Sequence, residues 1–180
     1  EFHSEAFTRS GGELKMMQLW VNLPAKDKMT TPGYQSITAD VIPQATLEDD
    51  AGTVRVIAGR YGDVAGPAHT FSPLNVWDMQ LKQSHDVTLH QPEGWSTALV
   101  VLEGEVTVNG TENAREGQLV VLSQKGEAFH LEAGSDAKVL LMAGEPLQEP
   151  IVGYGPFVMN TKTQIAEAIR DFNSGRFGQI

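Results

Sequence analysis

Three residues near the start of the chain, His3-Ser4-Glu5, include two side chains that commonly bind metal ions. On a β-strand, side chains two positions apart point to the same face, so a strand here would let His3 and Glu5 reach one ion together. Imidazole and carboxylate ligands suit iron, nickel, copper, manganese or zinc. Two protein ligands do not complete a metal centre, and the alternative for this pair is an ordinary exposed strand face.

The composition of the chain narrows the range of partners. The 180 residues carry a net charge of −10 with a pI near 4.8, which argues against nucleic acid and anionic membrane as direct partners, because both require a basic patch. No run approaches the roughly 20 apolar residues of a membrane span. The absence of cysteine excludes disulfides and thiolate metal sites. It also fits a reducing compartment, so we expect a cytoplasmic protein.

Most of the chain has the pattern of a β-protein. From Val41 onward, short alternating segments such as Asn75–Lys82 are divided by turns, and Asn109-Gly110 is a strong hairpin signal. Strands that recur at this spacing predict a sandwich or barrel. The apolar run at 16–23 has the length of a further strand. The tail predicts a helix from about Thr163 to Asn173, capped by Thr161 or Thr163.

Glycines within the β region resemble those of the cupin family, a double-stranded β-barrel of jelly-roll type. Gly104 bends a strand after "ALVVLE", Gly117 begins the next strand, and Gly126 marks a turn before His130. We expect a complete barrel with strands from about Gly66 to Pro146. In cupins, a first motif with two spaced histidines and a glutamate supplies metal ligands, and a second motif supplies one histidine.

The first cupin motif is incomplete in this chain. The stretch "TLHQPEGWSTALVVLEG" holds His90 and Glu93 but no His-x-His pair, and bulky Trp95 stands near an expected ligand position. We therefore expect this barrel to be free of metal, with His90 and His130 as solvent-facing or locally hydrogen-bonded histidines.

Two long stretches outside the barrel indicate which family of cupins the chain resembles. "MQLWVNLPAKDKM" near the start and "GEPLQEPIVGYGPFVMNTKTQIAEAIRDFNSGRFG" at the end, together with the barrel between them, resemble the pirin family over essentially all 180 residues. Pirins are bicupins, with two barrels face to face. In the family, the amino-terminal barrel binds one metal through a His-Pro-His stretch and the His and Glu of a "HSE" stretch. The carboxy-terminal barrel is metal-free.

The resemblance assigns roles to the residues of the opening motif. His3 and Glu5 match the "HSE" ligands, while the earlier histidine pair has no counterpart here, so two further histidine ligands are expected in a missing amino-terminal part. We expect the chain to lack roughly the first hundred residues of a family member. Residues 1–40 would be the remnant strands and connection of the amino-terminal barrel. Residues 41–150 would form the carboxy-terminal barrel, and residues 151–180 a segment whose helix packs back toward the amino-terminal domain.

Two functions are implied for the intact protein. The first is a flavonol (quercetin) 2,3-dioxygenase-like oxidoreductase with one divalent transition metal. Iron is the first choice, nickel, copper, manganese and zinc are alternatives, and Glu5 is both ligand and catalytic base. The second is a non-enzymatic, redox-sensing regulator that acts through protein contacts. For the 180 residues alone we expect no bound metal and no activity, and we expect the missing segment or a second chain as partner.

Overall fold

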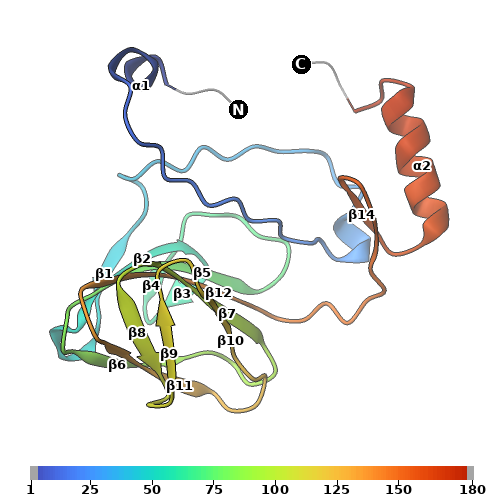
Figure 1. Cartoon of the computed structure of the whole chain (residues 1–180). Coiled ribbons are helices and arrows are strands. Elements are labelled where there is room, and N and C mark those ends of the chain that lie inside the picture. Colours follow the sequence, from blue (N-terminus) through green and yellow to red (C-terminus); the bar gives the residue numbers. More distant parts are fainter. Residues whose placement is uncertain (1–3, 178–180) are drawn as a thin grey trace.

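The computed structural model describes residues 4–177, and its centre is a barrel made of two antiparallel sheets (Figure 1). The six-stranded sheet has the order β1-β2-β5-β12-β7-β10, and the four-stranded sheet has the order β6-β11-β8-β9. Because most neighbours in these sheets are distant in sequence, the chain crosses between the sheets as a jelly roll does. The fold is the cupin barrel that the glycine pattern predicts.

The elements follow one another along the chain in a β-rich order. Their bounds are α1 (Glu5–Ser10), the 3₁₀ turn η1 (Ala25–Asp27), β1 (Gln44–Thr46), the 3₁₀ turn η2 (Glu48–Asp50), β2 (Gly52–Ala58), β3 (Arg60–Tyr61), β4 (Val64–Ala65), β5 (Leu74–Leu81), β6 (Asp86–His90), β7 (Ser96–Glu103), β8 (Glu105–Val108), β9 (Glu112–Arg115), β10 (Leu119–Val121), β11 (Ala128–Ala133), β12 (Ala137–Gly144), β13 (Val152–Tyr154), β14 (Phe157–Met159) and α2 (Lys162–Asn173).

Alternate side chains of the strands fill the space between the two sheets. In β2 and β6 the burial of successive residues alternates strictly, as expected for strands with one face toward a core. The buried side chains come from both sheets, and the following are no more than 1% exposed: Val54, Val56, Met79, Leu89, Leu99, Val101, Val106, Leu131, Val139 and Leu141. This apolar interior closes the barrel, because burial of apolar surface is the main favourable term in folding.

The strands of the barrel begin before Gly66, the start expected for the complete barrel. β2 pairs with β5 from Gly52↔Leu81 onward, and β1 pairs with β2, so two strands that precede Gly66 belong to the six-stranded sheet. The expected start near Gly66 is therefore wrong. The Gly-rich stretch after β2 forms the small hairpin β3–β4. This hairpin interrupts the alternation of apolar residues, but the six-stranded sheet continues with β5.

The first forty residues differ more from expectation. No strand occurs between Ser4 and Pro43, and the apolar run at 16–23 is extended but lies outside both sheets. An extended segment becomes a strand only when a neighbour accepts and donates its backbone hydrogen bonds. The described part of the chain provides no such neighbour to this segment. The remnant strands expected for residues 1–40 are thus absent from the described residues.

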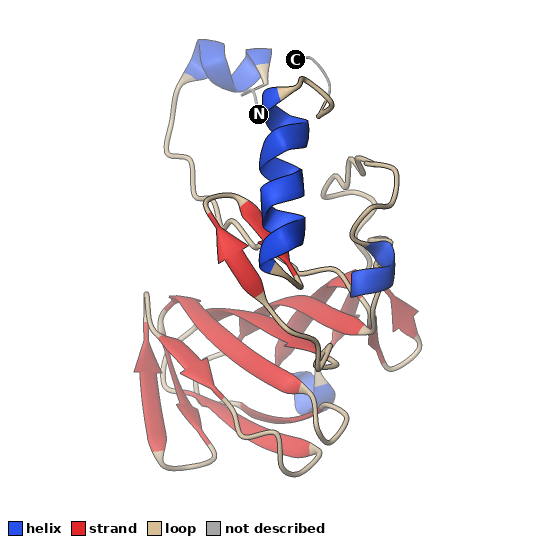
Figure 2. Ribbon diagram, turned by 90° about the vertical axis from the view of Figure 1, so that its right-hand side faces the viewer, coloured by secondary structure: helices blue, strands red, loops and turns tan. Residues whose placement is uncertain are grey.

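The tail forms the predicted helix, α2, at Lys162–Asn173. Thr161 caps it, because its side chain accepts a hydrogen bond from the backbone N–H of Gln164, and the Gln164 side chain accepts one from the backbone N–H of Thr161 in return. Ile165 and Ala168 are buried on one face. The helix packs on the β13–β14 hairpin, and both lie on the side of the six-stranded sheet, away from the barrel interior (Figure 2).

The hairpin signal and the bend at Gly104 are confirmed. β8 and β9 pair across Asn109-Gly110, where both residues have positive φ. Gly104 has a φ of 78°, and a Cβ at this position would collide with the backbone carbonyl of Asp136. The β7–β8 bend therefore requires glycine both for its backbone conformation and for the close approach of another loop.

Matched glycine substitutions separate these two requirements. Gly110→Ala should destabilise the chain by about 1–2 kcal/mol, the usual cost of a left-handed backbone, since nothing lies within 4 Å of the added Cβ. Gly104→Ala should cost about 1–3 kcal/mol more, because the loop at Asp136 must shift. Urea unfolding of both variants beside the parent measures the difference. Equal destabilisation would mean that the loop yields without cost.

Candidate functional site

Glu5 lies in the first turn of a short helix and not on a strand. Ser4 is the N-cap of α1, because its Oγ accepts a hydrogen bond from the Phe7 backbone N–H at 3.2 Å. The Glu5 carboxylate is exposed and receives a charged hydrogen bond from Arg9 Nη2 at 2.9 Å. A strand here would have placed His3 and Glu5 on one face. From Ser4 onward the chain does not form that strand. His3 lies outside the described residues.

No metal cluster forms among residues 4–177, where no three His, Asp or Glu side chains converge as ligands would. The assignment of His3 and Glu5 as ligands stays a prediction. The described residues alone do not fit a metal centre. They offer one carboxylate of the predicted set, and that carboxylate is paired with Arg9.

The histidines of strands β6 and β11, His90 and His130, lie on the outer surface of the barrel. In β6, Val87 and Leu89 point inward, so His90 points outward; in β11, Phe129 and Leu131 point inward, so His130 does the same. A ligand in a cupin barrel must point into the interior, and here that space is packed with apolar side chains. This alternation gives a physical reason for the expectation that the barrel holds no metal, which remains a prediction.

Local contacts account for the position of His130. Its Nδ1 lies 3.3 Å from Thr88 Oγ1, its Nε2 lies 3.5 Å from Asp86 Oδ2, and its backbone N–H donates to Asn109 Oδ1 at 2.9 Å. Thr88 is the cross-strand partner of His130 in the β6–β11 ladder. His130 therefore belongs to the polar outer face of the four-stranded sheet.

A second candidate site is an apolar groove on the other side of the barrel. It has a volume of about 680 Å³, and its walls come from the extended segment around Trp20, the start of β5, the end of β12 and the loop after it. Several large apolar side chains remain exposed there, among them Trp20 (67%), Val121 (71%) and Ile151 (71%). Contiguous apolar surface of this kind marks a place where proteins contact one another.

Charged and polar contacts hold the extended segment beside the barrel. Lys15 Nζ donates to Glu103 Oε1 at 3.0 Å, and this hydrogen bond, together with the attraction between the charges, raises the pKa of Lys15 and lowers the pKa of Glu103. Further along, the Ala25 N–H donates to Glu149 Oε2 at 2.7 Å. Glu149 also accepts a hydrogen bond from Asn160 Nδ2, so it joins the segment to the tail.

The sequence offered no signal for these anchoring residues. Glu103 and Glu149 lie 88 and 124 positions from their partners Lys15 and Ala25. A single surface glutamate has no local pattern that reveals so distant a partner.

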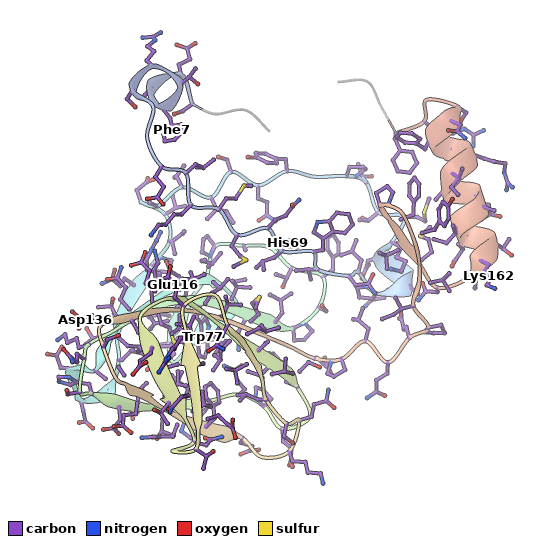
Figure 3. The ribbon with its side chains drawn as sticks, in the orientation of Figure 1. Phe7, His69, Trp77, Glu116, Asp136 and Lys162 are labelled. Atoms are coloured by element: carbon purple, nitrogen blue, oxygen red, sulfur yellow. The ribbon has the colours of Figure 1, made fainter. Side chains whose placement is uncertain are left out.

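Figure 3 shows that the opening helix with Phe7 lies far from the barrel interior, where Trp77 is located.

None of the helices among residues 4–177 has the length and apolar character that crossing a membrane would require.

Comparison with known proteins places this architecture in a family. Residues 76–178, more than half of the chain, match the model of the pirin C-terminal cupin domain. A Pseudomonas aeruginosa protein, provisionally named quercetin 2,3-dioxygenase PA2418, is 51% identical over 98% of the chain. The chain spans 62% of the length of that relative. Mouse pirin is 36% identical over 90% of the chain, which spans 57% of its length.

A solved structure agrees with the fold described above. The crystal structure of quercetin 2,3-dioxygenase from Acinetobacter baumannii is 53% identical and superposes with a TM-score of 0.85. The match covers 89% of this chain and 56% of that one. The chain has a cupin barrel, matches the pirin domain over more than half of its length and has relatives that carry the pirin name. It therefore belongs to the pirin family.

Proposed function

We propose that the chain is part of a metal-dependent pirin with quercetin 2,3-dioxygenase-like activity, in which it supplies the carboxy-terminal barrel and part of the metal-binding motif. The observation that carries this proposal is the 53% identity and TM-score of 0.85 to the quercetin 2,3-dioxygenase of A. baumannii. The proposed substrate is a flavonol. The match covers 56% of that protein, and parts of a family-length protein outside this chain would supply the other ligands.

His3 and Glu5 are the proposed contributions of this chain to the site. The metal would be a divalent transition ion, with iron first among the alternatives. When bound, it would supply the open coordination positions for oxygen and a chelating substrate. Glu5 would accept the proton of the flavonol hydroxyl, a role suited to a carboxylate within hydrogen-bond reach of it. For this, the Glu5 carboxylate must give up its hydrogen bond with Arg9 and bind the metal instead.

We further propose that the 180 residues alone are inactive and hold no tight metal. One described carboxylate, paired with Arg9, leaves most of the coordination sphere to water. A segment that bears the other ligands would have to complete the sphere, either in the same chain or from a second one.

Regulation through protein contacts is a second candidate function. The exposed apolar side chains beside the groove, such as Trp20 and Ile151, favour it, because such a surface is typical of an interface. The same surface could instead contact the remainder of a family-length protein. Only measurements on that longer protein separate the two functions.

Metal analysis tests the ligand assignment. After dialysis against a weak chelator, a family-length protein should retain about one iron per chain, and the 180-residue chain should retain far less. His3→Ala in the longer protein should lower its metal content at least about tenfold. His130→Ala is the matched control and should change nothing, because His130 lies on the outer face of the barrel. Stoichiometric iron in the 180-residue chain, lost on His3→Ala, would overturn the proposal.

Turnover of quercetin tests the activity itself. In the iron-loaded, family-length protein, Glu5→Gln should lower kcat at least about 100-fold, the usual contribution of a positioned base. Glu93→Gln serves as the control and should leave kcat within about twofold, since Glu93 lies in an exposed loop of the other barrel. Absence of turnover in the unmodified, metal-loaded protein would favour the regulatory function.

A further inference from the structure

A cavity of about 820 Å³ opens where the edges of the two sheets face each other, between β1 and β6. We call it the seam cavity. It is bounded by Thr46 of β1, the β3–β4 hairpin, the first residues of β5, the end of β6 and Trp95 of the following loop. Small-molecule sites in proteins have volumes of roughly 300–1,000 Å³. The seam cavity is therefore large enough for a compact ligand.

Aromatic side chains dominate its deeper wall. Trp77, Trp95 and Tyr61 line the seam cavity, so two of the three tryptophans of the chain lie there. The Tyr61 and Trp77 rings meet edge to face, with centroids 5.2 Å apart and planes at 88°. Trp77 is only 3% exposed, while Tyr61 and Trp95 are half-buried against the core. This contact fixes the two rings and leaves a wall suited to another planar ring.

Hydrogen bonds hold the cavity in a preformed shape. The Arg60 N–H donates to Asn75 Oδ1 at 3.0 Å, which fixes the β3–β4 hairpin to β5. Asn75 Nδ2 in turn donates to Gln91 Oε1 at 2.8 Å, which fixes β5 to the end of β6. Within the hairpin, Arg60 Nη2 donates to the Asp63 carbonyl at 3.1 Å. A ligand would thus enter a site whose walls are already ordered, which lowers the entropic cost of binding.

One buried donor in a residue of the cavity wall, Trp77 Nε1, has no acceptor within residues 4–177. Folded proteins pair more than nine in ten of their buried polar groups, so an unpaired donor calls for water or a ligand atom. Burial, and secondly the negative charge of Glu48, raise the pKa of Tyr61, so its hydroxyl stays a donor at neutral pH. The Tyr61 hydroxyl is thus a donor that the wall of the seam cavity can offer to an acceptor.

We propose that the seam cavity binds a small planar aromatic molecule that carries a carbonyl or hydroxyl oxygen. The ring would lie against Tyr61, Trp77 and Trp95, and the oxygen would accept hydrogen bonds from the donors of the wall. This site does not include Glu5 and does not depend on the proposed oxygenase activity.

The three indole N–H groups of the chain provide a direct measurement. In an NMR titration of the ¹⁵N-labelled 180-residue chain with 4-hydroxyacetophenone, the Trp77 and Trp95 indole signals should move together and saturate with one Kd below about 1 mM. The Trp20 signal should stay in place, because Trp20 lies in the apolar groove. Trp20→Phe and Trp95→Phe assign the signals. No saturable shift, or equal shifts at all three tryptophans, would overturn the proposal.

Matched variants and a matched probe test the chemistry. Tyr61→Leu should weaken binding about tenfold, whereas Tyr154→Leu, at an exposed tyrosine of β13, should leave the Kd unchanged. Cyclohexyl methyl ketone, which keeps the carbonyl but lacks the aromatic ring, should bind about three- to tenfold more weakly. Equal affinity for both ketones, or equal effects of both tyrosine variants, would contradict the assignment.

A final control separates this site from the proposed metal site. The variant Glu5→Ala should bind 4-hydroxyacetophenone with the Kd of the parent chain, because Glu5 lies in α1 and does not border the seam cavity. Loss of binding in this variant would place the ligand elsewhere. Failure of quercetin turnover in the longer protein would leave the expected titration unchanged, so the two proposals fail independently.

Discussion

The structure depends on one constraint, the filling of the barrel interior by apolar side chains from both sheets. Residues such as Met79, Leu99, Leu131 and Val139 fill this interior and are fully buried. Because side chains alternate along a strand, each inward leucine or valine turns its neighbours outward. The positions of His90 and His130 follow directly, since both stand next to buried residues on their strands. A barrel packed in this way can serve as a scaffold, with binding confined to its edges and outer faces.

The outer face of the six-stranded sheet and the segments beside it have a different character. Here the chain leaves apolar groups exposed: Trp20 and Ile151 at the groove, and Phe172 and Phe177 at the end of α2. The rings of Phe157, Phe172 and Phe177 form a cluster with centroids about 6 Å apart. The extended segment is held by contacts such as that of Lys15 with Glu103, and it has no strand partner within residues 4–177. These features share one side of the barrel (Figure 1). Exposed apolar surface of this extent is typical of an interaction surface.

The seam cavity shows how the same packing creates a binding site at the margin of the core. Where β1 and β6 diverge, the aromatic rings of Trp77 and Trp95 replace the aliphatic interior, and amide groups replace apolar contacts. The seam cavity and the proposed metal site differ in their physical requirements. The seam cavity needs a preformed aromatic wall with a donor, whereas a metal site would need several ligands brought together around one ion.

The sequence by itself determined the parts of the structure that depend on local chemistry. The alternation of apolar residues predicted the strands, Asn109-Gly110 predicted the hairpin, and Gly104 predicted the bend. Thr161 or Thr163 was the expected cap of the last helix, and the structure uses Thr161. These features follow from backbone conformation and from hydrogen bonds between near neighbours, which a short stretch of sequence contains. The family resemblance likewise rested on long local motifs, and the matched domain confirmed it.

Tertiary structure decided what depends on partners far along the chain. The run at 16–23 has the composition of a strand, but a strand needs a second segment for its hydrogen bonds, and none lies beside it within residues 4–177. Glu5 entered a helix because Ser4 could cap it and Arg9 lay one turn away, an alternative that the strand-based reasoning did not consider. The seam cavity joins residues from Thr46 to Trp95, and only the folding of the two sheets brings those side chains together around one space.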